Sequence, residues 1–252
     1  MALASFQRAL FDLIAQPALC MQAKENPGIL SDRYELTPKE FSRLHSVIRQ
    51  KGMATNCTLY RINRVTPLYT LLPYTCKLLG NDLLPLLIAF WEKNGRTNLQ
   101  FKDEVLLFAQ YLQTAIIKGA VQIPFLEEIL NFETKINELR YQKEETGVDA
   151  TGGTYTLNSC IRVVSFGHHP QTLFDLLTSD EPVKAASSAV PAGQYYLLLE
   201  QTGDEIDMKV ISAELGYILD NIGSYKALPR ELLETGLVRE QVTVQNLRTR
   251  IP

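Results

Sequence analysis

Gln142-Lys143-Glu144-Glu145-Thr146-Gly147, followed by Thr151-Gly152-Gly153-Thr154, divides the sequence into two parts of different character. These polar, turn-forming residues are typical of a linker. Apolar residues before the linker recur at helical spacing, whereas the sequence after it is rich in strand formers. The sequence therefore predicts an α+β protein, with an all-α helical domain at residues 1–145 and a small α+β, winged-helix-like domain at residues 154–252.

The first part of the sequence predicts six or seven helices. Thr37 and Glu40 flank Pro38 in the pattern of a capping box, which predicts a helix that starts at Pro38. Pro73 predicts a break between two helices within residues 57–80. The other stripes of apolar residues spaced three or four apart lie at residues 6–14, 82–93, 101–116 and 125–139.

The second part predicts a hairpin, helices and a closing strand. Thr202-Gly203-Asp204 forms the expected turn between two strands, and Ser212 is the expected cap of a following helix. Residues 179–193, rich in Pro, Ala, Ser and Gly, are expected to form a loop. The predicted strands lie at residues 155–166, 194–201, 205–211 and 237–244, and the predicted helices at 212–222 and 229–235.

Composition excludes several classes of protein. Hydrophobic residues make up 46% and charged residues 21% of the chain, which is typical of a globular protein. We find no run of about 18 uncharged apolar residues, so we expect no membrane association. The four cysteines, Cys20, Cys57, Cys76 and Cys160, form no C-x-x-C pair, which favours reduced thiols in a cytoplasmic protein.

No motif of a common catalytic centre occurs in the sequence. The chain has only three histidines, and His168-His169 is the sharpest chemical feature because imidazoles bind metals and titrate near neutral pH. Adjacent residues of a strand point to opposite faces, which favours a structural role over a metal site or a catalytic site. We therefore expect no catalytic residue and no cofactor or metal in this chain.

A local excess of basic residues lies between Lys39 and Lys77, where seven basic residues accompany one acidic residue, Glu40. Such a patch could receive phosphates or an acidic protein surface, or it could be a solvated helix face. Residues 1–150 hold 17 basic and 16 acidic residues and residues 151–252 hold 8 and 12, a balance that argues against a nucleic-acid partner. Tyrosine and arginine are favoured at protein interfaces, so the predicted partner-binding residues are Tyr60, Arg61, Arg64, Tyr69 and Tyr74.

A second candidate binding segment lies in the C-terminal part. Tyr195, Tyr196, Leu197 and Leu198 form an apolar strand. At a sheet edge this strand could bind an extended peptide through backbone pairing. A fully buried strand has the same pattern.

The stretch Cys57-Thr58-Leu59-Tyr60-Arg61-Ile62-Asn63-Arg64, with Leu71-Leu72-Pro73-Tyr74 and Leu78-Leu79-Gly80, resembles a known helical domain. It is similar to the N-terminal domain, long labelled DNA-binding, of partner subunits of multinuclear non-heme iron-dependent oxidases. Pro124-Phe125-Leu126-Glu127-Glu128 and the start of the chain fit the same pattern. The resemblance covers about residues 3–140 and, more loosely, the second domain, which resembles that of methanobactin-type partner proteins.

This resemblance implies a non-catalytic partner subunit that forms a heterodimer with an iron oxidase. The subunit would help recruit a ribosomally synthesised precursor peptide for modification at cysteine, and the iron would belong to the oxidase. Leu36-Thr37-Pro38-Lys39-Glu40 also resembles small helical subunits of ring-cleaving dioxygenases. The alternatives are a DNA-binding transcriptional regulator that uses the basic patch, and a metal enzyme that uses His168 or His169.

Overall fold

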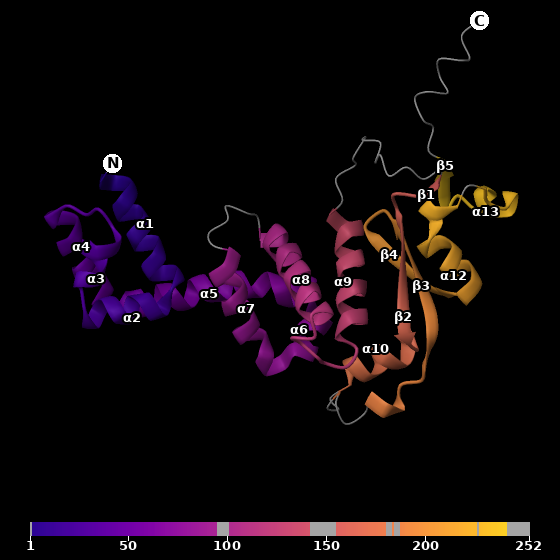
Figure 1. Cartoon of the computed structure of the whole chain (residues 1–252), viewed down its shortest axis with the longest axis horizontal. Coiled ribbons are helices and arrows are strands. Elements are labelled where there is room, and N and C mark those ends of the chain that lie inside the picture. The colour runs from indigo at the N-terminus through magenta and orange to yellow at the C-terminus, as the bar shows by residue number, and fades with distance from the viewer. Residues whose placement is uncertain are drawn as a thin grey trace, which may run out of the picture. The chain divides into compact units, whose positions relative to one another are not determined.

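A computed structural model describes residues 2–94, 101–141, 155–179, 183, 187–225 and 227–240 of the protein. The chain forms two compact units, Met1–Thr70 and Leu71–Pro252. The first unit is helical, and the second combines helices with β-sheets (Figure 1). The predicted α+β class with a helical N-terminal part is confirmed.

The first unit packs short amphipathic helices around one core. Leu13, Leu30, Leu44 and Ile48 are completely buried there, and the Tyr34 hydroxyl donates a hydrogen bond to Asp12 Oδ2 (2.8 Å) at its border. The predicted capping box is present, since Thr37 accepts from Glu40 N–H and the Glu40 side chain accepts from Thr37 N–H. The helices are α1 (Ala2–Ala15), α2 (Pro17–Glu25), α3 (Gly28–Arg33), α4 (Pro38–Ile48) and most of α5 (Lys51–Leu71).

The second unit begins with a helical layer. The predicted break at Pro73 is confirmed, because α5 ends at Leu71 and α6 begins at Pro73. Gly80, at a φ of 49°, ends α6. The helices of this layer are α6 (Pro73–Leu79), the 3-10 turn η1 (Gly80–Asp82), α7 (Leu83–Asn94), α8 (Phe101–Ile117) and α9 (Leu126–Tyr141).

A three-stranded antiparallel sheet follows, with the strand order β2-β3-β4. The predicted turn joins β3 to β4, with Thr202 opposite Glu205, and Ser212 caps α12 by accepting from Leu215 N–H (3.2 Å). A smaller sheet pairs β1 with β5. The elements are β1 (Tyr155–Leu157), β2 (Ile161–His168), α10 (Pro170–Thr178), η2 (Ser187–Ala189), β3 (Ala192–Thr202), β4 (Glu205–Ile211), α12 (Ala213–Asp220), η3 (Ile222–Ser224), α13 (Arg230–Glu234) and β5 (Val238–Glu240).

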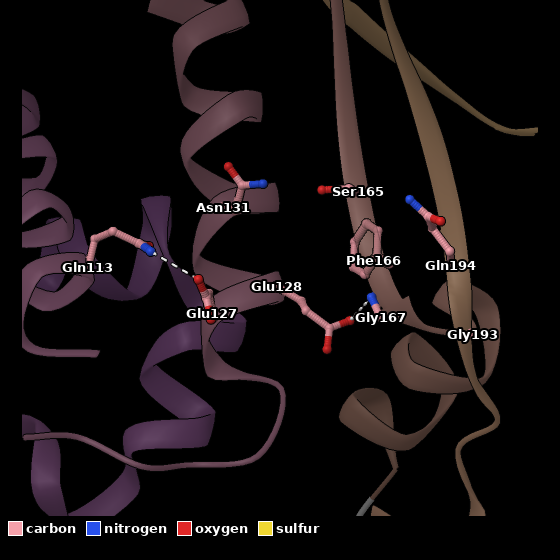
Figure 2. A pocket seen from close by; sticks show the side chains of 9 residues that line it. All are labelled: Gln113, Glu127, Glu128, Asn131, Ser165, Phe166, Gly167, Gly193 and Gln194. Atoms are coloured by element: carbon pink, nitrogen blue, oxygen red, sulfur yellow. Dashed lines mark hydrogen bonds between the residues drawn. The ribbon is translucent and has the colours of Figure 1, made fainter. Parts of the chain in front are cut away.

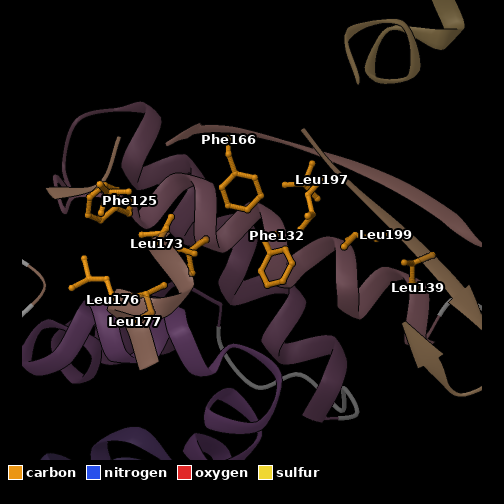
Figure 3. Packing of buried hydrophobic residues seen from close by; sticks show 12 residues of the cluster. Phe125, Phe132, Leu139, Phe166, Leu173, Leu176, Leu177, Leu197 and Leu199 are labelled. Atoms are coloured by element: carbon orange, nitrogen blue, oxygen red, sulfur yellow. The ribbon is translucent and has the colours of Figure 1, made fainter. Parts of the chain in front are cut away.

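The three-stranded sheet packs against helices on both faces, mainly over β2 and β3. One face packs on α9 and α10, where Phe132 of α9 meets Phe166 of β2 and Leu197 and Leu199 of β3 (Figure 3). On the opposite face, Tyr196 and Leu198 pack with Leu219 of α12. Three strands, with α9 and α10 on one face and α12 on the other, thus form the α+β part of the chain.

The compact units differ from the predicted domains, whose boundary we placed at residues 145–154. Helix α9 belongs to the same core as the sheet, because Ile129, Phe132 and Leu139 pack with Val164 and with other sheet residues. The apolar stripe of α9 predicts a helix but not its partner, and this partner lies beyond the linker. Residues 142–154, residues 241–244 of the last predicted strand, and residues 180–182 and 184–186 of the predicted loop lie outside the described residues.

All four cysteines are free thiols, as expected. Cys20, Cys57 and Cys76 are buried, whereas Cys160 is exposed just before β2. Burial raises the pKa of the Cys20 thiol, and the neighbouring Cys57 adds to this effect. Burial also raises the pKa of the Cys76 thiol to about 12. The buried thiols therefore act as small apolar core residues.

Candidate functional site

The candidate site is built around the first turn of α9. Phe125 precedes this helix with a φ of 64°, a conformation that bulky residues rarely adopt and that other contacts must stabilise. The Phe125 ring is buried and meets the His168 ring edge to face, with 4.7 Å between the ring centroids. This contact joins the start of α9 to the end of β2.

Glu128 connects the same two elements by hydrogen bonds. The register between β2 and β3 shifts between Phe166 and His168, so Gly167 lies in a β-bulge. Glu128 Oε2 accepts from Gly167 N–H (3.0 Å), and Glu128 Oε1 lies 2.6 Å from His168 Nδ1. One carboxylate therefore holds both the bulged backbone and the imidazole.

An open cavity of about 640 Å³ lies beside this carboxylate, between α9 and β2 (Figure 2). We call it the α9–β2 groove. Glu127 is exposed on its helical wall and accepts a hydrogen bond from Gln113 of α8 (3.4 Å). The groove is lined by Gln113, Glu127, Glu128, Asn131, Ser165, Phe166, Gly167, Gly193 and Gln194.

The chemistry of the groove suits binding by hydrogen bonds. Carboxylates accept hydrogen bonds, and side-chain amides both donate and accept them. The acidic residues lie in the first turn of α9, where the helix dipole stabilises negative charge. The groove therefore offers complementary partners to a polar ligand that carries N–H donors or basic groups.

The two adjacent histidines have separate roles. His168 points to Glu128 and Phe125, whereas His169 caps α10 and accepts from Thr172 N–H through Nδ1 (3.4 Å). The His169 ring also meets the Tyr195 ring edge to face. In the described part of the chain, no three His, Cys, Asp or Glu side chains are grouped so that they could hold a metal ion.

The predicted partner-binding residues are only partly brought together. Tyr60 and Arg64 are neighbours on α5, with the guanidinium 5.6 Å from the ring centroid, and Arg61 and Tyr69 lie on the same helix. Tyr74 belongs to the second unit, where its ring packs against Phe174. Tyr74 is therefore a half-buried residue that packs against the core of the second unit.

Helix α5 also carries an apolar surface that the sequence analysis missed. Leu59, Ile62 and Tyr69 are spaced by three and seven residues, which places them on one helical face. Each of the three side chains is at least half exposed. The sequence does show these apolar residues at helical spacing, in addition to the apolar residues that form the buried face of α5. We call these three residues the α5 stripe.

The basic patch that predicted a regulator is also divided. Lys77 is in the second unit, where its Nζ donates to the carbonyl oxygens of Leu177 and Ser179 (2.7 Å each) at the end of α10. This lysine stabilises a helix terminus. The exposed basic residues that remain on α4 and α5 and between them are Lys39, Arg43, Arg49 and Lys51.

The predicted peptide-binding strand does not lie at a sheet edge, where a peptide could pair with it. Tyr195, Tyr196, Leu197 and Leu198 lie in β3, which pairs with β2 on one side and with β4 on the other. Their backbone groups are therefore occupied within the sheet, so a peptide cannot pair with them as it would with an edge strand. The open edges of this sheet belong to β2 and β4.

No protein-family model and no curated protein sequence matches this chain. The similarity to partner subunits of iron oxidases thus stays a prediction. No helix in the described residues is both long enough and apolar enough to cross a membrane.

Proposed function

We propose that this chain is a non-catalytic accessory subunit that binds an extended peptide in the α9–β2 groove and an iron-dependent oxidase on α5. The peptide would be a ribosomally synthesised precursor, which the oxidase modifies at cysteine. The observation that carries the proposal is the groove itself, because it lies between the acidic first turn of α9 and the edge strand β2. A groove of this kind suits peptide binding by strand addition.

The backbone of β2 is oriented for this pairing. Gln201 N–H donates to the Cys160 carbonyl (2.8 Å), so the backbone of Cys160 faces β3. Backbone groups alternate between the two sides of an antiparallel strand. Ser165 therefore presents its N–H and C=O to the open edge, whereas the Gly167 N–H is occupied by Glu128. A peptide strand could pair with Ser165 while its basic side chains face Glu127.

Replacing Ser165 with proline should weaken peptide binding about tenfold, because proline removes the outward N–H at the centre of the groove. The substitution leaves the pairing with β3 in place, since that N–H points away from β3. The measurement is fluorescence anisotropy with a labelled peptide of alternating lysine and threonine. Val210→Pro on the other edge strand is the matched control. Equal affinities of the two variants would refute the groove as the binding site.

The α5 stripe is the proposed contact for the oxidase, because contiguous exposed apolar residues mark protein-binding surfaces. Tyr60, Arg61 and Arg64 lie on other faces of the same helix, where the Tyr60 ring packs against Phe11 of α1, so they are not part of the stripe. Iron chemistry would then belong to the oxidase. This chain would supply the binding surfaces and orient the peptide.

Ile62→Asp should reduce recovery of the oxidase by about tenfold or more, because it places an unpaired charge in an apolar interface. The measurement is a tagged pull-down from native cells, with mass spectrometry and iron analysis of the eluate. Asn63→Asp adds the same charge at an exposed polar position beside the stripe, next to Leu59, and should reduce recovery of the oxidase much less than Ile62→Asp does. If the wild-type chain recovers no iron protein and brings down nucleic acid instead, the proposal fails.

A further inference from the structure

Strand β4 has an open edge and an apolar strip that the described part of the unit leaves uncovered. Among the described residues, only β3 pairs with β4. Met208 and Val210 are both more than half exposed, although they lie on the same sheet face as the buried Leu199 and Leu197, their partners across the ladder. Helices α9 and α10 cover this face over β2 and β3 (Figure 3).

The hairpin register shows which backbone groups of β4 face outward. A two-residue turn joins Thr202 to Glu205, and these two residues close the hairpin as a hydrogen-bonded pair. Alternation along β4 then directs the backbone of Asp207 and Lys209 towards β3. The outward N–H and C=O groups belong to Ile206, Met208 and Val210, the residues that also form the apolar strip.

The sequence of β4 is complementary to itself about Met208. In an antiparallel pair of two β4 strands centred on this residue, Met208 faces its own copy and Ile206 faces Val210. On the opposite face of the sheet, Asp207 faces Lys209 twice, once on each side of the two-fold axis. Every outward N–H and C=O of the strip finds a partner, and Lys209, which lies 3.7 Å from Glu200 of its own chain, gains Asp207 of the copy as a second counter-charge.

Other registers lose this complementarity. A shift by one residue turns the apolar strip to the wrong face. Two neighbouring registers keep the apolar residues on the same face. One is centred on Asp207 and places the two Asp207 side chains opposite each other, and the other does the same with Lys209; like charges in this position are destabilising. The charge pattern therefore selects one alignment and favours a second copy of the chain as the occupant of this edge.

We propose that two copies of this chain associate through β4, related by a two-fold axis at Met208. The two sheets then join into one, in the order β2-β3-β4-β4-β3-β2. The apolar strips of the two copies cover each other between the helical layers. This association uses a different edge from the α9–β2 groove and does not depend on the proposed function.

The test is sedimentation equilibrium of the full chain and of four variants. The wild-type chain should be a dimer, and Met208→Pro, which removes the central outward N–H, should be a monomer. Asp207→Lys and Lys209→Glu should each weaken association by roughly tenfold, because each places two like-charged pairs in the interface. The exchange variant D207K/K209D restores opposite charges and should recover the dimer.

We expect each variant to be folded, because a proline whose N–H faces solvent is tolerated at an edge, and circular dichroism and urea unfolding measure this. A wild-type chain that stays monomeric up to its solubility limit overturns the proposal. A dimer that persists in Met208→Pro, or an exchange variant no stronger than the single variants, also overturns it.

Discussion

Replacing Glu133 by alanine should lower the free energy of unfolding by about 3 kcal/mol at pH 5 and by much less at pH 8. Glu133 of α9 is 3% exposed, and its two carboxylate oxygens accept hydrogen bonds from Tyr74 N–H (2.7 Å) and Thr75 N–H (2.9 Å). These N–H groups begin α6. Without the carboxylate, they remain buried with no acceptor in the structure described here, which is costly.

The dependence on pH follows from the burial of Glu133. Burial raises the pKa of this carboxyl from 4.5 to about 7, although its hydrogen bonds to Thr75 and Tyr74 oppose the shift. The folded protein therefore holds the proton more tightly than the unfolded chain. The resulting stability is fully present below pH 4.5 and is lost as the pH rises through 7, a change of roughly 3 kcal/mol. The alanine variant lacks this dependence.

Urea unfolding of wild type and Glu133→Ala at pH 5 and pH 8 measures both effects. Cys76 also lies beside Glu133, but its thiol has a pKa of about 12 and stays neutral over this range. Glu127→Ala, in the exposed first turn of the same helix, is the control and should change the free energy of unfolding only slightly. A constant difference between wild type and Glu133→Ala would contradict the predicted proton linkage.

Gly216→Ala should destabilise the second unit by about 2–3 kcal/mol, even though alanine is the better helix former by about 1 kcal/mol. Gly216 lies in α12 and is buried against Tyr196 of β3. A Cβ atom on Gly216 would overlap the Cβ and Cγ atoms of Tyr196. The Tyr196 ring is almost fully buried and its hydroxyl accepts from Gln194 Nε2 (2.6 Å), so the ring has little room to move.

The measurement is the midpoint of urea unfolding, with Gly223→Ala as the matched control. A Cβ atom at Gly223 meets no other atom within 4 Å, so this variant should keep wild-type stability. If Gly216→Ala unfolds at the same urea concentration as the control, α12 does not pack on Tyr196 as described.

Local chemistry predicted much of the secondary structure. The capping box at Thr37, the break at Pro73, the turn before Glu205 and the cap at Ser212 are all present. Each of these features depends on residues a few positions apart, whose preferences act within the segment itself. Such features can therefore be inferred from sequence alone.

The packing partners and the candidate site could not be predicted in this way. Glu128 and His168 are 40 residues apart, and although Gly167 in a strand is typical of a bulge, it does not indicate that the bulge meets Glu128. The apolar pattern of Tyr196 to Leu199 fits an edge strand as well as a central one, and only the pairing with β4 decides between them. These features depend on which segments meet in the fold.

The position of Cys160 gives the wild-type chain a built-in attachment point for a spectroscopic reporter. The three other thiols are buried, so a maleimide dye would attach to the folded protein at this residue alone. Cys160 directly precedes β2, roughly 17 Å along the strand from Ser165 in the groove. A fluorophore there would report peptide binding by energy transfer without any engineered cysteine.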